Sequence, residues 1–211
     1  MNFKDAFLQM PIIAILRGVR PSEAVAIAEA VLESGIRVIE IPLNSPDPLT
    51  SIRHVAKELA GRAVVGAGTV LSEAEVDRVA DTGGRLIVSP NTDPQVIRKT
   101  KARGLMSAPG VMTPSEAFAA LSAGADVLKM FPGEFFSLPV IRSMAAVLPK
   151  TSVLVLVGGV TPDMIEAYCG SPVAGFGVGS SIYKPGMTAA DVKVSAAGFA
   201  DAIRRAGFGR I

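Results

Sequence analysis

The stretch PIIAILRGVRPSEAVAIAEAVLESG, residues 11–35, joins a short apolar run to an amphipathic segment. It contains the unit from which the fold is predicted. Residues 11–16 are apolar without a break, which is typical of a parallel strand buried on both faces. From Pro21 onward the apolar residues fall at positions 24, 27, 28, 31 and 32, which is the spacing of one helix face. Pro21 suits the first position of a helix, and Gly35 suits its end. The stretch therefore predicts one strand followed by one helix.

The same unit recurs to the end of the chain, and its repetition predicts the fold class. Each of the later apolar runs precedes a helical pattern, with a last helix near residues 188–206; the runs occupy residues 37–43, 63–68, 85–90, 105–110, 126–131, 152–157 and 173–179. Eight strand–helix units in one chain predict an α/β protein, a (β/α)8 TIM barrel. A doubly wound open sheet is the alternative, but no G-x-G-x-x-G fingerprint follows the first strand. No long linker divides the chain, so a single domain is expected over residues 1–211.

Composition excludes several classes of function. The 211 residues are 49% hydrophobic and 19% charged, and a net charge of +2 provides no basic surface for nucleic acid. The N-terminus mixes charged and apolar residues as a short amphipathic helix does, without the pattern of a signal peptide. No apolar run approaches the roughly 20 residues of a membrane span, and one cysteine permits no internal disulfide. A cytoplasmic protein with no membrane partner is therefore expected.

Four polar residues stand out because they lie in or just after the predicted strands, where a barrel gathers its chemistry. Arg17 and Thr69 follow the first and third strands, while Glu40 and Lys129 lie within the second and sixth. The last two could form a buried ion pair, but such pairs rarely improve on apolar packing. A desolvated lysine loses its proton and forms Schiff bases with carbonyls, while a nearby carboxylate moves protons. Because arginine binds carboxylates, the set predicts a substrate such as a 2-oxo acid.

Glycines at the ends of the seventh and eighth strands predict a phosphate site. VGGVTP at residues 157–162 and GVGSS at residues 177–181 expose backbone N–H groups ahead of a helix. The loops after these two strands are the recurrent phosphate position in this fold. Glycine pairs are common in turns, so it is the occurrence of both motifs at these two strands that carries the prediction.

Other chemistries find little support in the sequence. His54 is the only histidine and lies within a predicted helix, and Cys169 is the only cysteine. Neither a zinc cluster nor a serine activated by histidine is therefore expected. A magnesium site made of carboxylates alone stays open, although the strand ends offer few acids. The sequence predicts no metal and no cofactor.

Seven motifs occur in one order between about residue 11 and residue 205: AILRGV, IEIPLNSPDP, GAGTVL, LIVSPN, LKMFP, VGGVTP and GFGVGSSIY. In these motifs the chain resembles the class I 2-keto-3-deoxy-6-phosphate aldolases, most closely the members of galactonate breakdown. The resemblance implies reversible, metal-independent cleavage of 2-dehydro-3-deoxy-6-phosphogalactonate to pyruvate and D-glyceraldehyde 3-phosphate. It also implies a homotrimer, and an N-terminal helix over residues 2–10 that closes the bottom of the barrel.

The functional residues of that family fall on matching positions of this chain. By resemblance, Lys129 would form the Schiff base, Glu40 would be the general acid and base, and Arg17 and Thr69 would hold the carboxylate end of pyruvate. The other expected substrate-binding residues are Pro90, Asn91, Phe131, Gly158, Gly159, Thr161, Gly179 and Ser180.

One departure from the family bears on the substrate. The related phosphogluconate aldolases carry an arginine in a Thr-Leu-Arg-Thr motif after the second strand, where this chain has Pro42-Leu43-Asn44-Ser45. This favours the galactonate-derived substrate without deciding which C4 epimer is used, so a 2-dehydro-3-deoxy-6-phosphogluconate aldolase is the alternative. Two further alternatives are a phosphosugar isomerase or epimerase with Glu40 as its base, and a phosphate-binding regulatory barrel without turnover.

Overall fold

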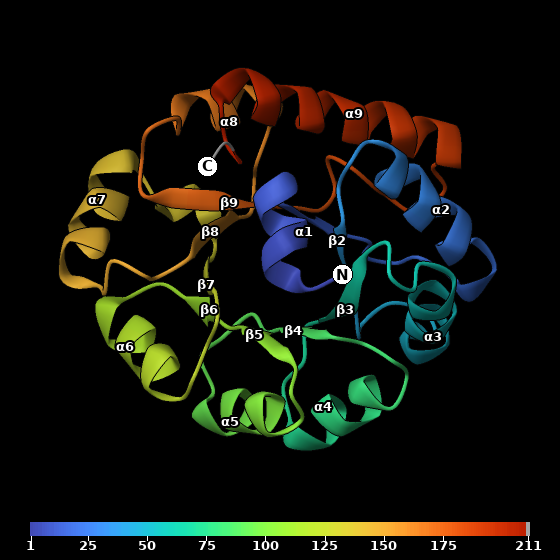
Figure 1. The fold of residues 1–211 in the computed structure, drawn as a ribbon, viewed down its shortest axis with the longest axis horizontal. Coiled ribbons are helices and arrows are strands. Elements are labelled where there is room, and N and C mark those ends of the chain that lie inside the picture. Colours follow the sequence, from blue (N-terminus) through green and yellow to red (C-terminus); the bar gives the residue numbers. More distant parts are fainter. Residues whose placement is uncertain (210–211) are drawn as a thin grey trace.

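The computed structural model describes residues 1–209, whose strands form one parallel sheet that curls into a nearly closed barrel (Figure 1). The expected domain of residues 1–211 ends with residues 210 and 211, which lie outside the described residues. The strand order is β5-β4-β3-β2-β1-β9-β8-β7-β6. The strands are β1 (Ile12–Ile15), β2 (Val38–Pro42), β3 (Val64–Gly68), β4 (Leu86–Val88), β5 (Met106–Ala108), β6 (Gly110–Val111), β7 (Leu128–Met130), β8 (Leu154–Val157) and β9 (Val173–Val178). The predicted TIM-barrel class is confirmed.

Strands β5 and β6 come from one predicted run, residues 105–110, which Pro109 divides. Proline has no N–H group and cannot donate to the ladder of a sheet. Even so, the N–H of Ser89 donates to the carbonyl of Ala108 at 3.2 Å, and the N–H of Lys129 donates to the carbonyl of Pro109 at 3.0 Å. The divided run therefore connects β4 on one side to β7 on the other, which brings the two edges of the sheet together.

Helices follow the strands and form a ring around them (Figure 1). They are α2 (Pro21–Glu33), α3 (Pro48–Glu58), α4 (Glu73–Ala80), α5 (Pro94–Ala102), α6 (Pro114–Ser122), α7 (Leu138–Val147), α8 (Pro162–Ala167) and α9 (Ala189–Ala206), with a short 3-10 helix, η1 (Gly133–Phe135). Several begin with proline, whose missing N–H would have no partner at that position anyway. Thr113 and Thr188 cap α6 and α9 by accepting hydrogen bonds from backbone N–H groups.

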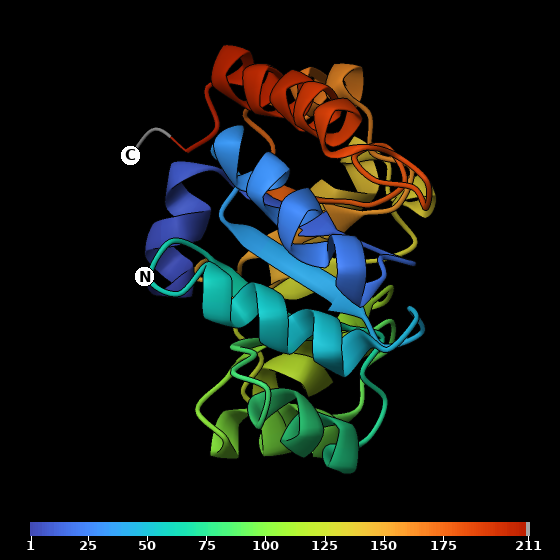
Figure 2. The same ribbon diagram turned by 90° about the vertical axis from the view of Figure 1, so that its right-hand side faces the viewer.

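Helix α1 (Phe3–Gln9) closes the N-terminal end of the barrel, as expected for residues 2–10. Its residues Phe3, Ala6 and Phe7 belong to the apolar cluster that fills the barrel interior. A Cβ atom at Gly175 of β9 would lie 2.5 Å from Phe7 Cζ, so glycine is needed there to leave room for the ring. Figure 2 shows α1 and the N-terminus on one side of the barrel. A site inside this barrel must therefore open at the opposite end.

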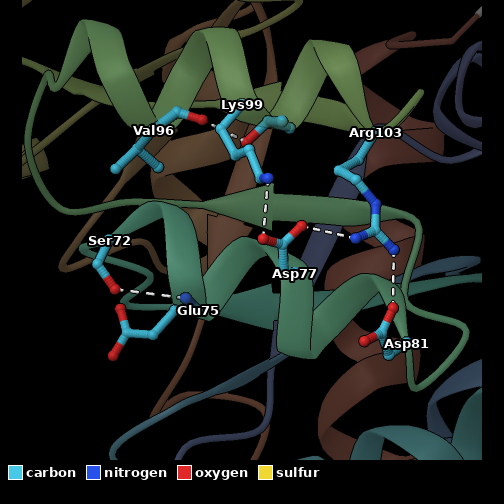
Figure 3. A network of polar contacts seen from close by, with 8 residues as sticks. Ser72, Glu75, Asp77, Asp81, Val96, Lys99 and Arg103 are labelled. Atoms are coloured by element: carbon cyan, nitrogen blue, oxygen red, sulfur yellow. Dashed lines mark hydrogen bonds and ion pairs between the residues drawn. The ribbon is translucent and has the colours of Figure 1, made fainter.

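Charged side chains on the surface link α4 to α5 (Figure 3). Asp77 accepts a hydrogen bond from Arg103 at 2.6 Å and pairs with Lys99 at 2.8 Å, and Arg103 also donates to Asp81 at 2.7 Å. The side chains of Asp77, Lys99 and Arg103 are 29–37% exposed and that of Asp81 is 69% exposed, so water and salt weaken their attraction. The buried apolar faces of the two helices therefore supply most of their contact energy.

The longest helix is α9, which has 18 residues and carries Gly198 at an exposed position in its interior. Within residues 1–209, neither α9 nor any other helix combines the length and the apolar character needed to cross a membrane. A Cβ atom added at Gly198 would meet no atom within 4 Å. The glycine thus has no packing role that the structure reveals.

Replacing Gly198 with alanine is expected to stabilise the protein. Glycine loses more conformational freedom than alanine when a helix forms, so the free energy of unfolding should rise by about 0.5–1 kcal/mol. Urea denaturation measures the change. Gly175→Ala is the contrasting variant and should be less stable than the wild type, because its methyl group would collide with Phe7. A Gly198→Ala protein that unfolds at lower urea than the wild type would contradict this account.

Candidate active site

Lys129 lies in the middle of β7, and its side chain is buried although lysine is usually exposed. The residue pairs in register with Gly110 of β6 and Val155 of β8, and only 7% of its surface is exposed. Its Nζ atom lies 4.6 Å from the centroid of the Phe131 ring. The amine is therefore held close to the point where β7 passes into the following loop.

Glu40 approaches the barrel interior from β2 and is buried more deeply, with 2% of its surface exposed. Among residues 1–209, its Oε2 atom finds no hydrogen-bond partner. Burial is the main influence on the carboxyl and raises the pKa of Glu40 to about 7, while the positive charges of Lys129 and Arg17 oppose that rise. A carboxyl group that titrates near neutral pH can both accept and donate a proton.

Burial has the opposite consequence for the amine. It lowers the pKa of Lys129 and so favours the neutral form, which has the free electron pair that a nucleophile needs. The Glu40 carboxylate opposes this by raising the pKa of Lys129, and Arg17 lowers it further. The charge of each group thus opposes the effect that burial has on the pKa of the other.

Gly68, the last residue of β3, leaves the space that the Glu40 carboxylate occupies. A Cβ atom at position 68 would overlap Glu40 Oε2 and lie 2.5 Å from Glu40 Cδ. Any side chain at this position would therefore push the carboxylate away from its place beside Lys129. The position of the acid thus depends on a glycine of the neighbouring strand as well as on β2.

Arg17 follows β1, and the segment after β2 holds it in position. Nη1 of Arg17 donates a hydrogen bond to Asn44 Oδ1 at 2.6 Å. The N–H of Gly18 donates to Ser45 Oγ at 2.9 Å, so the backbone of the same loop is also fixed. A guanidinium group held in this way offers planar donors to a carboxylate at the strand ends.

A cavity of about 420 Å³ opens at the C-terminal end of the strands, opposite α1. A much smaller void of about 10 Å³ lies deeper in the barrel, with Glu40 in its wall. Lys129 borders both spaces. The amine therefore lies between the cavity, which has room for a small phosphorylated molecule, and the buried acid.

The structure brings most of the predicted site residues together in the cavity wall: Arg17, Thr69, Pro90, Lys129, Phe131, Gly158, Gly159, Gly179 and Ser180. Glu40 borders the deeper void instead. Two predicted residues, Asn91 and Thr161, line neither space. Asn91 is exposed, and Thr161 caps α8 by accepting a hydrogen bond from the N–H of Met164 at 3.4 Å.

Thr69 has an unusual backbone conformation. Its φ angle of 57° lies in the left-handed region, which a β-branched residue rarely adopts. Such a conformation costs about 1–3 kcal/mol and persists mainly where the surrounding structure enforces it, often at functional sites. The strain therefore singles out Thr69 independently of any motif.

The glycine turn after β8 forms part of the cavity wall. Gly158 and Gly159 have φ angles of 113° and 64°, which favour glycine. Among the described residues, no backbone carbonyl accepts a hydrogen bond from either of their N–H groups. Consecutive N–H groups without protein partners can bind an anion.

Across residues 1–209, no group of three or more His, Cys, Asp or Glu side chains could hold a metal ion.

Several residues that shape the site were not predicted from the sequence. Tyr183, Lys184 and Pro185 line the cavity although they lie well beyond the end of β9. Only the folded path of that loop brings them back to the site, so inspection of strand ends alone does not find them. Gly68 could have been predicted, because a glycine beside Thr69 in a buried strand indicates a close neighbour.

Comparison with known proteins extends this description. A family model described as KDPG and KHG aldolase matches residues 4–197. A probable 2-dehydro-3-deoxy-6-phosphogalactonate aldolase of Rhizobium meliloti (strain 1021) is 48% identical over 186 residues, which are 88% of each chain. The 2-dehydro-3-deoxy-6-phosphogalactonate aldolase of Escherichia coli (strain K12) is 42% identical over 198 residues, 94% of this chain and 97% of that one.

A solved structure described as native KDPGal resembles this one with a TM-score of 0.92 at 42% identity. The similarity covers 94% of this chain and 97% of that chain, so it extends over the whole barrel. Sequence, family model and three-dimensional structure agree along nearly the full length. The chain belongs to the KDPG and KHG aldolase family.

Proposed function

We infer that the protein is a class I aldolase, a carbon–carbon lyase that reversibly cleaves 2-dehydro-3-deoxy-6-phosphogalactonate to pyruvate and D-glyceraldehyde 3-phosphate. One observation carries the inference: the buried amine of Lys129 lies between a cavity of about 420 Å³ and the wall of a deeper void that contains Glu40. Membership of the aldolase family and two relatives named for this substrate support it. The remaining site residues supply binding for the two ends of the substrate.

Lys129 begins the reaction as a nucleophile. Its neutral amine attacks the C2 carbonyl of the substrate. The adduct takes a proton from the Glu40 carboxyl and loses water, which gives a protonated imine and leaves Glu40 as a carboxylate. The positive imine withdraws electrons, so the C3–C4 bond can break and leave an enamine on the lysine. Burial contributes twice, because it lowers the pKa of Lys129 and keeps bulk water away from the imine.

Glu40 moves the protons of the same reaction. As a carboxylate it accepts the proton of the C4 hydroxyl while the C3–C4 bond breaks, and the aldehyde product leaves. It then returns a proton to C3 of the enamine, which produces the pyruvate imine. Water hydrolyses that imine, releases pyruvate and restores the amine. A pKa of about 7 suits a group that takes both roles.

The two ends of the cavity are assigned to different groups of the substrate. Arg17 and Thr69 are assigned to the pyruvate carboxylate, since the Arg17–Asn44 hydrogen bond holds a guanidinium at the strand ends. Backbone groups of Gly158, Gly159, Gly179 and Ser180 are assigned to the phosphate. Pro90 and Phe131 form part of the wall between them. Asn91 and Thr161 stay predictions as substrate-binding residues.

We also propose a homotrimer in the cytoplasm, as the resemblance to the family implies. Leu71, Met112 and Phe135 follow β3, β6 and β7 and are large exposed apolar side chains, with Phe135 66% exposed. Such side chains supply surface for subunit contact. Sedimentation velocity at micromolar protein tests the assembly, and cell fractionation tests the location.

Trapping with pyruvate and borohydride tests the central inference. Borohydride reduces the imine to a stable secondary amine, so peptide mass spectrometry should find the pyruvate adduct on Lys129 alone. Lys129→Arg should form no adduct and release no detectable pyruvate in an assay coupled to lactate dehydrogenase. An adduct on a different lysine would contradict the assignment, and a Lys129→Arg enzyme with substantial turnover would favour the isomerase or epimerase alternative.

Gly68→Ala tests the placement of the acid. The methyl group would overlap Glu40 Oε2 and displace the carboxylate, and a misplacement of this kind costs about 100-fold in rate. We expect kcat/KM for cleavage to fall by about that factor. Gly198→Ala adds the same methyl group far from the cavity and should leave kcat/KM unchanged. Equal loss in both variants would show that the carboxylate position is not the cause.

Glu40→Gln should separate stability from activity. The folded protein raises the pKa of Glu40 from 4.5 to about 7, so it binds the proton more tightly than the unfolded chain does. The stability from this group is therefore fully present below pH about 4.5 and is lost as pH rises through about 7. At pH 8, Glu40→Gln should unfold at a higher urea concentration than the wild type, and its free energy of unfolding should be larger by up to about 3 kcal/mol. Its turnover should be lost. The stability difference should shrink toward pH 5, and a difference independent of pH would refute the raised pKa.

A further inference from the structure

We propose that Lys184 and Glu134 set the affinity of the cavity for the phosphate end of the substrate with opposite signs: Lys184 attracts the phosphate, and Glu134 repels it. The proposal rests on the proposed function, which places a phosphate at the glycine turns. Neither residue appeared among the predicted site residues. Within residues 1–209, neither takes part in an ion pair, so both charges are available to act on a ligand.

Among residues 1–209, Lys184 is one of three cationic residues that line the cavity, and no carboxylate lines it, that of Glu134 included. The other two, Arg17 and Lys129, are assigned to the reacting end of the substrate. Lys184 shares the wall with Gly179 and Ser180, which precede it in the same loop after β9. It is therefore the cation left to neutralise a phosphate at the other end.

The loop that carries Lys184 is fixed on several sides. The N–H of Tyr183 donates to the carbonyl of Gly179 at 3.0 Å, and its phenol donates to Glu23 of α2 at 2.9 Å. Pro185 packs against Gly18, where a Cβ atom would lie 2.7 Å from its Cγ. A lysine on a fixed loop loses less conformational freedom on binding than one on a free loop.

Glu134 lies in η1 and meets the glycine turn after β8. A Cβ atom at Gly158 would lie 2.9 Å from Glu134 Oε2, and one at Gly159 would lie 3.0 Å from Glu134 Oε1. The two oxygens therefore cover the two glycines that are assigned to the phosphate. Gly133 permits this close approach, because a Cβ atom there would lie 2.6 Å from the carbonyl oxygen of Gly158.

A carboxylate beside a phosphate site raises the energy of the bound dianion, while a lysine lowers it. At partly exposed positions one unit charge changes affinity by about three- to thirtyfold, depending on distance and local dielectric. The opposing pair lets the cavity select a phosphorylated substrate without retaining the phosphorylated aldehyde product. Because both effects are electrostatic, both should weaken as salt concentration rises.

The test measures aldol condensation of pyruvate with D-glyceraldehyde 3-phosphate and with unphosphorylated D-glyceraldehyde. The readout is the ratio of the two kcat/KM values, which cancels any general loss of active enzyme. Lys184→Met should lower this ratio about tenfold, and Glu134→Gln should raise it about threefold. Both shifts should become smaller in added potassium chloride. Lys150→Met, an exposed lysine outside the cavity, is the matched control and should leave the ratio unchanged.

Each result has a defined meaning. An unchanged ratio in Lys184→Met or in Glu134→Gln overturns the role given to that residue. Shifts of both variants in one direction overturn the idea of opposing charges, because a structural disturbance would act in that way. The double variant should lie between the two single variants. A wild-type enzyme that condenses neither aldehyde with pyruvate overturns the proposed function itself, whereas an active enzyme with unchanged ratios overturns the charge assignment alone.

Discussion

Two ionisable groups are held out of water in this barrel, and their desolvation determines the chemistry of the site. Lys129 and Glu40 both lie inside the barrel, where water cannot stabilise their charges. Burial lowers the pKa of the amine and raises that of the acid, so the two pKa values move toward each other. Parallel strands make this possible, because their backbone hydrogen bonds fix both side chains without loops that would admit water.

Strands form one end of the cavity, and loops form the other. At the reacting end, strands hold the functional side chains, and Asn44 braces Arg17 with a hydrogen bond of 2.6 Å. At the far end, loops present backbone groups, and the charges of Lys184 and Glu134 lie on segments outside the barrel strands. Covalent chemistry needs positions that do not vary, whereas an anion tolerates several donor arrangements. A family can therefore alter its far end while keeping the lysine and the acid.

The fold and the chemical centre were predictable from the sequence, because both leave local signals. A lysine and a glutamate inside apolar runs are conspicuous, and the repeated strand–helix pattern places them at the same end of a barrel. The division of the fifth run at Pro109 was not predicted, since both pieces lie in one apolar stretch. Lys184 was not predicted as a site residue, because its position in the cavity wall depends on a tertiary contact between Pro185 and Gly18. Thr161 caps α8, which the sequence analysis did not predict for it, and its role in substrate binding stays a prediction.

The contact between Gly68 and Glu40 also restricts how such a barrel can evolve. A side chain at position 68 and a full-length glutamate at position 40 compete for one volume. A residue larger than glycine at position 68 therefore requires a shorter acid at position 40. In that shorter form the carboxyl no longer reaches the lysine as before, so the intermediate sequence is an impaired enzyme. The steric contact between the two residues in the barrel therefore links the substitutions that each position tolerates.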